Sequence, residues 1–148
     1  MLSQSVEYAL RAVAALAQAG AEARTVAQLA KQTKTPAADL GKVLQGLRRA
    51  GIVASRRGAG GGIALARDPA GLSVLEVVNA VEPIQRIRTC PLKLTGHGVR
   101  LCPLHRRLDN ALAMMEAAFA GVTVAEVLAE PSDSVPLCNF PAKPAGRA

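Results

Sequence analysis

The sequence predicts a mainly α-helical fold with a small β-hairpin, in the order of a winged helix-turn-helix followed by a long dimerisation helix. Three observations along the 148 residues predict it. Apolar residues recur at helical spacing up to residue 51, alternate over 52–66 around a glycine-rich stretch, and return as a narrow helical seam over 103–120. Three helices followed by a hairpin is the chain order of a winged helix-turn-helix.

Start and stop signals separate the predicted helices. The first is expected over residues 4–19 and ends before Gly20. Pro36 suits the first turn of a third helix, which ends at Gly51. Capping boxes, in which Ser or Thr pairs with Glu or Gln three residues later, start the second helix and two later ones. These pairs are Thr25 with Gln28, Ser73 with Glu76, and Thr123 with Glu126.

The helix predicted over 103–120 carries a narrow apolar seam between charged residues. An appended helix with such a stripe often pairs with its own copy, so we expect a homodimer rather than a seam that covers the domain core. The seam consists of Leu104, Leu108, Leu112, Met115 and Phe119.

These signals divide the chain into four parts. Residues 1–82 are predicted to form the winged helix-turn-helix domain and 83–102 a cysteine-containing cofactor loop. Residues 103–130 hold the dimerisation helix and a short following helix. The proline-rich tail over 131–148 lacks periodicity, and we expect it to be poorly ordered.

Charge is concentrated in the first half of the chain. The formal net charge is +7, and residues 1–72 hold ten Lys or Arg against four Asp or Glu. This asymmetry is typical of a protein that binds double-stranded DNA. One Tyr, two Phe and no Trp are too few stacking platforms for single-stranded nucleic acid. The sequence has no membrane span or signal-peptide order and an odd number of cysteines, so we expect a cytoplasmic protein without a membrane partner.

Candidate DNA contacts lie on the third helix, which is the recognition helix of this fold, and on the hairpin. Polar side chains near the helix start could read bases, or serve only the helix dipole and solvent. Arginines at the helix end could contact phosphates or complement the dipole. The wing arginines alternate in direction, so we expect Arg57, nearer the tip, to enter the groove. The candidates are Asp39, Lys42, Arg48, Arg49, Arg56, Arg57 and Gly58.

Cysteine and histidine residues gather between the winged domain and the long helix. Cys102 is expected at the helix N-cap and His105 one turn inside, so both side chains can face one point. A helix N-terminus favours the thiolate, the form that binds metal. Together with Cys90 they suit zinc or an iron–sulfur cluster, and the spacing alone does not choose between these. His97, between two glycines, is better explained as a solvated turn residue than as a ligand.

Three segments form a recognisable combination: VEYALRAV at 6–13, LGKVLQGLRRAGIVASRRGAGGGIALARD at 40–68, and a cysteine loop before a long helix. Over about residues 1–120 the chain resembles the Rrf2 family of transcriptional regulators, which includes the IscR, NsrR and RirA types. The resemblance implies a homodimeric repressor that binds a palindromic operator. It also implies a [2Fe-2S] or [4Fe-4S] cluster that senses iron–sulfur, redox or nitric oxide status.

The resemblance also implies a set of cluster ligands. The family loop is C-x5-C-x5-C, sometimes followed by x2-H; Cys90, Cys102 and His105 match it, whereas Gly96 replaces the middle cysteine. Some members use an acidic residue near the N-terminus of the partner subunit, and Glu7 occupies that region here. A site with two cysteines, a histidine and a glutamate favours [2Fe-2S] over [4Fe-4S].

Several alternatives stay open at this point. Cys90 and Cys102 could form a thiol-redox switch or a zinc site, or bind no cofactor, and Glu7 could be only a helix-start carboxylate. Cys138 in the tail is a spare ligand or a free thiol. A metalloenzyme is a remote alternative because no carboxylate adjoins the histidines in sequence to act as a base, so we expect no enzymatic activity.

Overall fold

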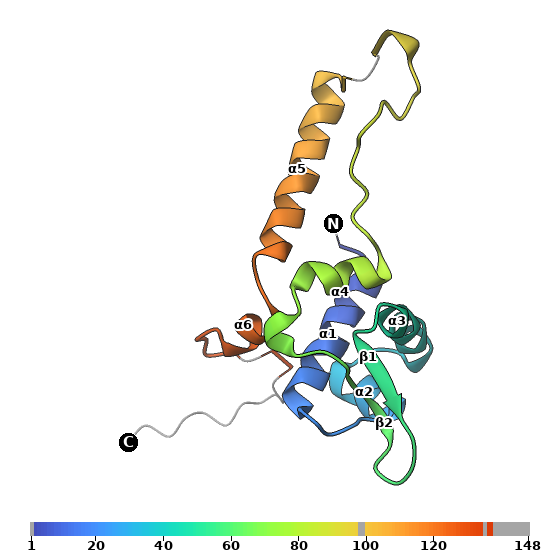
Figure 1. Ribbon diagram of the computed structural model, residues 1–148, viewed down its shortest axis with the longest axis vertical. Helices are drawn as coiled ribbons and strands as arrows, with labels where there is room; N and C mark the ends of the chain where they lie inside the picture. Colours follow the sequence, from blue (N-terminus) through green and yellow to red (C-terminus); the bar gives the residue numbers. More distant parts are fainter. Residues whose placement is uncertain (1, 98–99, 135, 138–148) are drawn as a thin grey trace.

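The computed structural model describes residues 2–97, 100–134 and 136–137 and confirms the predicted fold class (Figure 1). A helical body carries a hairpin, and a long helix rises from it beside an extended loop. The body contains α1 (Gln4–Ala19), α2 (Val26–Thr33), α3 (Ala37–Arg49), β1 (Val53–Arg56), β2 (Gly62–Leu65), a 3-10 turn (Pro69–Gly71) and α4 (Val74–Val81). A second 3-10 turn (Thr95–His97), α5 (Pro103–Ala120) and α6 (Val124–Ala129) follow.

Local signals start and end the helices much as predicted. All three capping boxes are present, with the hydroxyl and the Glu or Gln side chain bonded reciprocally to backbone N–H groups. Hydrogen bonds from Thr123 hold the pKa of Glu126 below its ordinary value. Pro36 lies one position earlier than expected, at the N-cap of α3. Gly20 and Gly51 follow α1 and α3 with positive φ, which terminates each helix without strain.

One aliphatic core lies among the first four helices and the hairpin. α1 is its central element and contacts α2, α3, α4, α6 and β2. Full burial of a leucine side chain stabilises a fold by about 1.5–3 kcal/mol. The buried aliphatic side chains of this core therefore supply much of the stability of the domain. The largest fully buried side chains include Leu16, Leu29, Leu40, Leu47, Ile52 and Leu72.

The hairpin is held against the start of α2. Its strands are antiparallel, with Val53 opposite Leu65, and Ile63 forms an isolated bridge with Arg24. Gly62 has φ 143, and a Cβ there would lie 2.5 Å from the carbonyl oxygen of Arg24. Only glycine allows this approach, so the root of the wing is fixed by backbone contacts.

The recognition helix α3 is in equally close contact with α4. A Cβ at Gly46 would lie 2.8 Å from the carbonyl oxygen of Ala80, near the end of α4. The two helix backbones therefore approach more closely than a side chain would permit.

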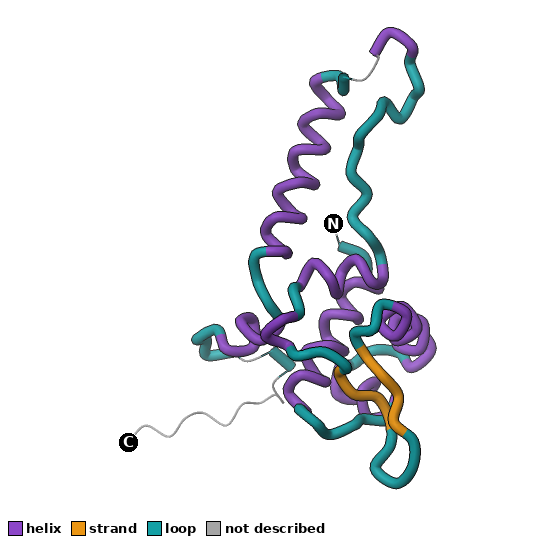
Figure 2. The backbone as a smooth tube through the Cα atoms, in the orientation of Figure 1, coloured by secondary structure: helices purple, strands orange, loops and turns teal. Residues whose placement is uncertain are grey.

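α5 differs from the other long helices because none of its 18 residues is buried. Figure 2 shows it rising away from the helical body. Leu104 is 64% exposed and Met114 is 74% exposed. The predicted seam is divided: Leu104 and Leu108 are exposed, whereas Phe119 packs against the cluster of Val6 and Val78. The first half of the seam is thus uncovered in the single chain.

Part of the expected tail lies against the body. Gln18 Nε2 donates to the Pro136 carbonyl at 2.7 Å, and Leu137 packs on the main core. Residues 138–148, with Cys138, lie outside the described residues. No helix in the described ranges is both long and apolar enough to cross a membrane.

Candidate DNA interface and metal-ligand loop

The turn between α2 and α3 sets the position of the recognition helix. Lys34 adopts the left-handed conformation with φ 52, between two buried threonines. Thr33 Oγ1 donates to the Leu29 carbonyl at 2.7 Å and lies 3.0 Å from Thr35 Oγ1. These bonds satisfy the buried hydroxyls and fix the tight connection between the helices. Sequence analysis did not identify these paired threonines.

The outer face of α3 carries the predicted polar contacts. Lys42 and Arg49 are exposed, and Asp39 is half-buried in the first turn. Gln45 is also exposed, one turn beyond Lys42, and its amide could bond to adenine. Sequence analysis did not identify Gln45, although its spacing from Lys42 places both residues on one face.

Two of the candidate arginines have partners within the chain. Arg48 Nη2 donates to Ser55 Oγ at 2.8 Å and thereby links the end of α3 to β1. Arg56 Nη1 donates to the Ala21 carbonyl at 2.6 Å. Both guanidinium groups are exposed at the surface but hold the wing in place.

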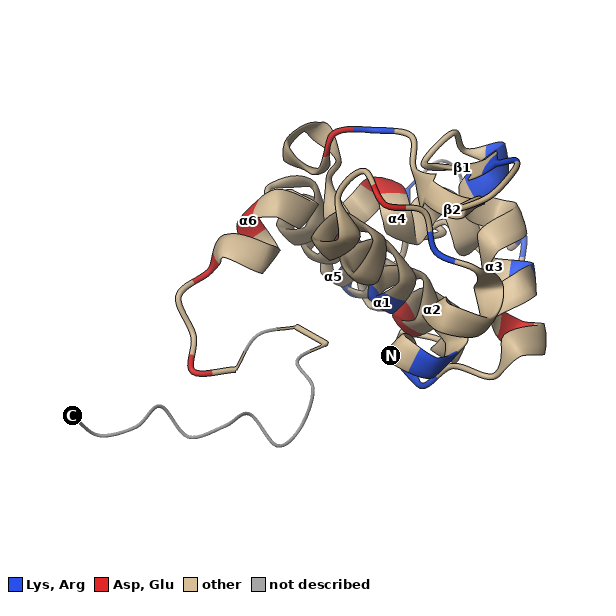
Figure 3. Cartoon of the chain, turned by 90° about the horizontal axis from the view of Figure 1, so that it is seen from below, with Lys and Arg blue, Asp and Glu red and all other residues tan. Residues whose placement is uncertain are grey.

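Arg57 is differently placed from Arg56. It is exposed, and within the described residues no hydrogen bond or ion pair involves its side chain. Gly58 follows with φ 93, which turns the chain at the wing tip. Figure 3 shows Lys and Arg gathered at the hairpin beside β1 and at separate points on α3. The wing tip therefore presents an exposed cation that is not engaged by another described residue, as do Lys42 and Arg49 on α3.

Cys102 and His105 come together at the start of α5. Cys102 is the N-cap residue, and its Sγ lies 3.3 Å from His105 Nδ1. The thiol makes no capping hydrogen bond to the helix. A sulfur and an imidazole nitrogen at one helix end form a donor pair suited to iron or zinc. The geometry of this pair agrees with the predicted arrangement.

Cys90 is buried, with 8% of its surface exposed, in the loop beside α5. Its carbonyl accepts from the Lys93 N–H at 2.9 Å, and Lys93 has φ 52. Within the described part of the chain, no three His, Cys, Asp or Glu residues form a group that could hold a metal ion. Among the described residues, the structure pairs Cys102 with His105 and adds no third ligand to them. The His97 side chain is outside what the structure describes.

Glu7 lies in α1 and has a partner other than the cysteines. Its Oε1 accepts from Arg11 Nε at 3.0 Å. Arg11 Nη1 in turn donates to the Thr33 carbonyl at 3.3 Å, directly before the helix-turn-helix turn. Glu7 is therefore two hydrogen bonds away from the end of α2, just before the turn that leads into the recognition helix.

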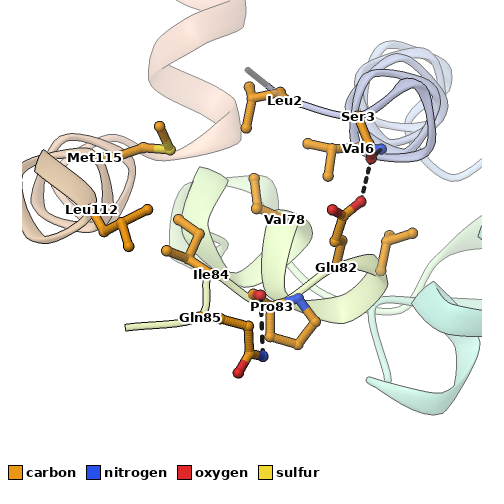
Figure 4. A pocket seen from close by; sticks show the side chains of 11 residues that line it. Leu2, Ser3, Val6, Val78, Glu82, Pro83, Ile84, Gln85, Leu112 and Met115 are labelled. Atoms are coloured by element: carbon orange, nitrogen blue, oxygen red, sulfur yellow. Dashed lines mark hydrogen bonds between the residues drawn. The ribbon is translucent and has the colours of Figure 1, made fainter. Parts of the chain in front are cut away.

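A cavity of about 480 Å³ lies where α1, α4 and α5 meet. Its lining is mainly aliphatic, and Figure 4 shows Leu112 and Met115 of α5 pointing toward Val78 and Ile84. Ser3 Oγ donates to the carboxylate of Glu82 at one side. This cavity shows that α5 is incompletely packed on its own body.

The comparisons with known proteins agree on one family. The model of Rrf2, described as an iron-dependent transcriptional regulator, matches residues 2–130. A putative HTH-type transcriptional regulator of Aquifex aeolicus is 27% identical over 131 residues, which cover 86% of this chain and 91% of that protein. The HTH-type transcriptional repressor NsrR of Streptomyces coelicolor is 29% identical over 98% of this chain and 99% of its own.

Solved structures show the same fold. CymR, the global cysteine regulator of B. subtilis, has a TM-score of 0.72 at 21% identity, covering 89% of this chain and 98% of its own. IscR of T. potens has a TM-score of 0.70 at 23% identity, covering 90% and 93%. These relatives and neighbours are transcriptional regulators rather than enzymes, as expected for this chain.

Proposed function

Because this chain belongs to the Rrf2 family of transcriptional regulators, we propose that it is a homodimeric repressor whose DNA affinity is set by an iron–sulfur cluster at the cysteine loop. The observation that carries the cluster is the pairing of Cys102 Sγ and His105 Nδ1 at 3.3 Å, in a family described as iron-dependent. The DNA, dimer and cofactor parts each have separate support.

The DNA part rests on the surface formed by α3 and the wing. Asp39, Lys42 and Gln45 line the side of α3 that would enter the major groove. Arg49 at the helix end suits a phosphate. Arg57 and Gly58 would reach the minor groove from the wing, while Arg48 and Arg56 hold that wing in place. A palindromic operator follows from two such surfaces in one dimer.

The dimer part rests on α5. An 18-residue helix without a buried residue does not form a stable element by itself in water. The exposed Leu104 and Leu108 would be covered if two copies of α5 packed together along the seam. Such packing would also place α5 and the loop over 83–102 of one chain beside the same segments of the other chain.

The cofactor part needs ligands from both chains. Cys90, Cys102 and His105 would come from one protomer, and the partner subunit's Glu7 would complete four ligands. Two thiolates with one imidazole and one carboxylate favour [2Fe-2S] over [4Fe-4S]. A bound cluster would be a group that can be oxidised, degraded or lost. Its loss would release the side chains that had been its ligands.

The route to DNA runs through Glu7. As a ligand, Glu7 would no longer be the partner of Arg11, which also bonds to the Thr33 carbonyl. Ligation would thus release or reorient Arg11 at the turn before α3. Because both recognition helices must fit the operator together, a small movement at each turn changes the affinity.

The second candidate function keeps the DNA-binding dimer and replaces the cluster with a thiol switch or zinc. It is favoured by one observation: Cys90 and Cys102 are both free thiols in the structure. Oxidation of such thiols could move the loop without any metal.

Anaerobic purification followed by visible absorption, iron and sulfide analysis tests the proposal. We expect a coloured protein containing iron and sulfide. Cys90→Ser and Cys102→Ser should each abolish cluster retention and leave the far-UV circular dichroism of the helical body unchanged, whereas Cys138→Ser should retain the cluster. A colourless protein with stoichiometric zinc would remove the cluster and favour the second candidate.

A further inference from the structure

The loop that carries Cys90 is tied to α5 by one arginine. Arg86 Nε and Nη2 donate to the two carboxylate oxygens of Asp109, each at 2.7 Å. Arg86 Nη1 donates to Glu116 Oε2 at 2.9 Å, and the Ile87 N–H adds a bond to Asp109 Oδ1 at 2.9 Å. Within the described residues, these are the only hydrogen bonds from 83–101 to α5.

This network differs from the other ion pairs of the structure. Arg86, Asp109 and Glu116 are 25%, 16% and 29% exposed, and the pairs join residues 23 and 30 positions apart. The other pairs are more exposed and join positions close in the chain, as in Arg11 with Glu7. A partly shielded, bidentate arginine serving two carboxylates is the arrangement in which an ion pair holds segments together.

Hydrogen bonding keeps both sides of the network charged. The Arg86 guanidinium holds the pKa of Asp109 below its ordinary value, and the two carboxylates raise the pKa of Arg86. The pair of Arg86 and Asp109 is therefore ionised at neutral pH.

The attachment sets the register between the loop and the helix. Cys102, His105 and Asp109 are spaced three and four residues apart, which puts them on one face of α5. Asp109 lies about 10 Å along the helix from Cys102, at 1.5 Å per residue. Cys90 is four residues beyond Arg86, or about 13 Å of extended chain. Because the loop runs antiparallel to α5 (Figure 2), anchoring Arg86 at Asp109 directs the segment with Cys90 along α5 toward the helix start, where Cys102 and His105 lie.

We infer that Arg86 is a positioning residue that holds the loop carrying Cys90 against α5 through its bonds to Asp109 and Glu116. What the thiols then bind rests on the proposed function; the placement of Cys90 does not. The network acts as a latch on the loop, defined by Arg86, Asp109 and Glu116. With the latch open, Cys90 loses its fixed position and its shielding from solvent.

Alkylation of Cys90 tests the latch without any cofactor. The full-length chain carrying Cys102→Ser and Cys138→Ser has Cys90 as its sole thiol, and iodoacetamide labelling is followed by mass spectrometry in the presence of a chelator. We expect slow labelling in this parent and an increase of at least about fivefold on Arg86→Gln, because the shielded thiol becomes exposed. Loss of a nearby positive charge would by itself lower thiolate content, so the increase reports opening.

Matched variants separate the latch from a general loss of charge. Arg88→Gln removes an exposed arginine two residues before Cys90 and should label no faster than the parent. Arg86→Lys, which keeps the charge but loses the bidentate geometry, should label at an intermediate rate. Adding Asp109→Asn to Arg86→Gln should have little further effect, because both changes open the same contact. Equal labelling of the Arg86→Gln variant and its parent would overturn the inference.

The cofactor is examined separately in the chain with all three cysteines. Arg86→Gln should lose iron to a chelator faster than the unsubstituted protein and change its visible circular dichroism. If the unsubstituted protein contains no cluster while Arg86→Gln still accelerates Cys90 labelling in the triple-variant chain, the proposed function fails and the latch stands. If the cluster is present and Cys90 labelling is unchanged, the proposed function stands and the latch fails.

Discussion

The winged domain buries whole side chains, such as Leu16 on α1 and Leu47 on α3, whereas α5 buries none of its 18 residues. The domain is held by aliphatic packing and capped helices. The arm, which consists of α5 and the loop over 83–102, is held by a few polar contacts and by apolar contacts at its base. Aliphatic packing of the domain resists local unfolding, whereas the few contacts of the arm can open at a small cost in free energy. The arm is therefore the part suited to respond to a ligand.

The largest difference between the two regions should appear in stability. Leu47→Ala removes a fully buried side chain and should lower the free energy of unfolding by about 3 kcal/mol. Leu104→Ala removes an exposed one and should change the unfolding of the winged domain by less than about 0.5 kcal/mol. Urea titration followed by far-UV circular dichroism, under monomeric conditions, measures both. Equal losses would mean that α5 is part of the domain core.

The second test concerns the uncovered half of the seam. Leu108→Asp places a carboxylate in the proposed interface and should weaken dimerisation by about 2 kcal/mol or more. Leu108 is a cleaner position than Leu112, which lines the cavity of its own chain. Asn110→Asp adds the same charge to an exposed position off the seam and serves as the control. Sedimentation velocity should show monomers only for Leu108→Asp; a dimer in both would place the interface elsewhere.

The third test stays within the winged domain. Arg57→Ala should weaken binding to any duplex by about 1 kcal/mol and reduce the slope of log affinity against log salt by about one. Arg107→Ala removes an equally exposed charge on α5 and should leave the slope unchanged. Fluorescence anisotropy across a salt series measures both variants. An unaltered slope for Arg57→Ala would remove the wing tip from the interface.

The smallest effect concerns acid. Arg86 lowers the pKa of Asp109 in the folded chain, so the contribution of this pair is present above the unfolded pKa and is lost as pH falls through the folded pKa. The latch should therefore be constant around neutrality and open only in acid. Arg86→Gln should raise the pKa of Asp109 toward its ordinary value, as measured by carboxyl ¹³C NMR. An unchanged titration would show that the pair does not form in solution.

Local features of this fold were predictable from the sequence. The capping boxes depend on residues three positions apart, and the change from helical to alternating apolar residues marks the hairpin. The pairing of Cys102 with His105 was predictable for the same reason, since one helical turn brings them together.

Contacts between distant residues could not be predicted in this way. Arg56, which is predicted to contact DNA, also donates to the carbonyl of Ala21, 35 residues earlier, and no sequence pattern indicates that bond. The bonds of Arg86 to Asp109 and of Gln18 to Pro136 also depend on how elements pack, which leaves no periodic signal in the sequence. Sequence patterns therefore identified candidate side chains, and packing determined which of them have partners.

The close approach of Gly46 to Ala80 limits how this regulator can vary. Even alanine at position 46 would meet the backbone of α4, so the mutation would shift the recognition helix rather than fill a space. A graft that exchanges α3 to change the operator must therefore keep a glycine at this crossing, while the exposed Lys42 and Gln45 remain open to substitution. New operator specificities can therefore arise from substitutions on the exposed side of α3, whereas the residues that pack against α4 must be kept.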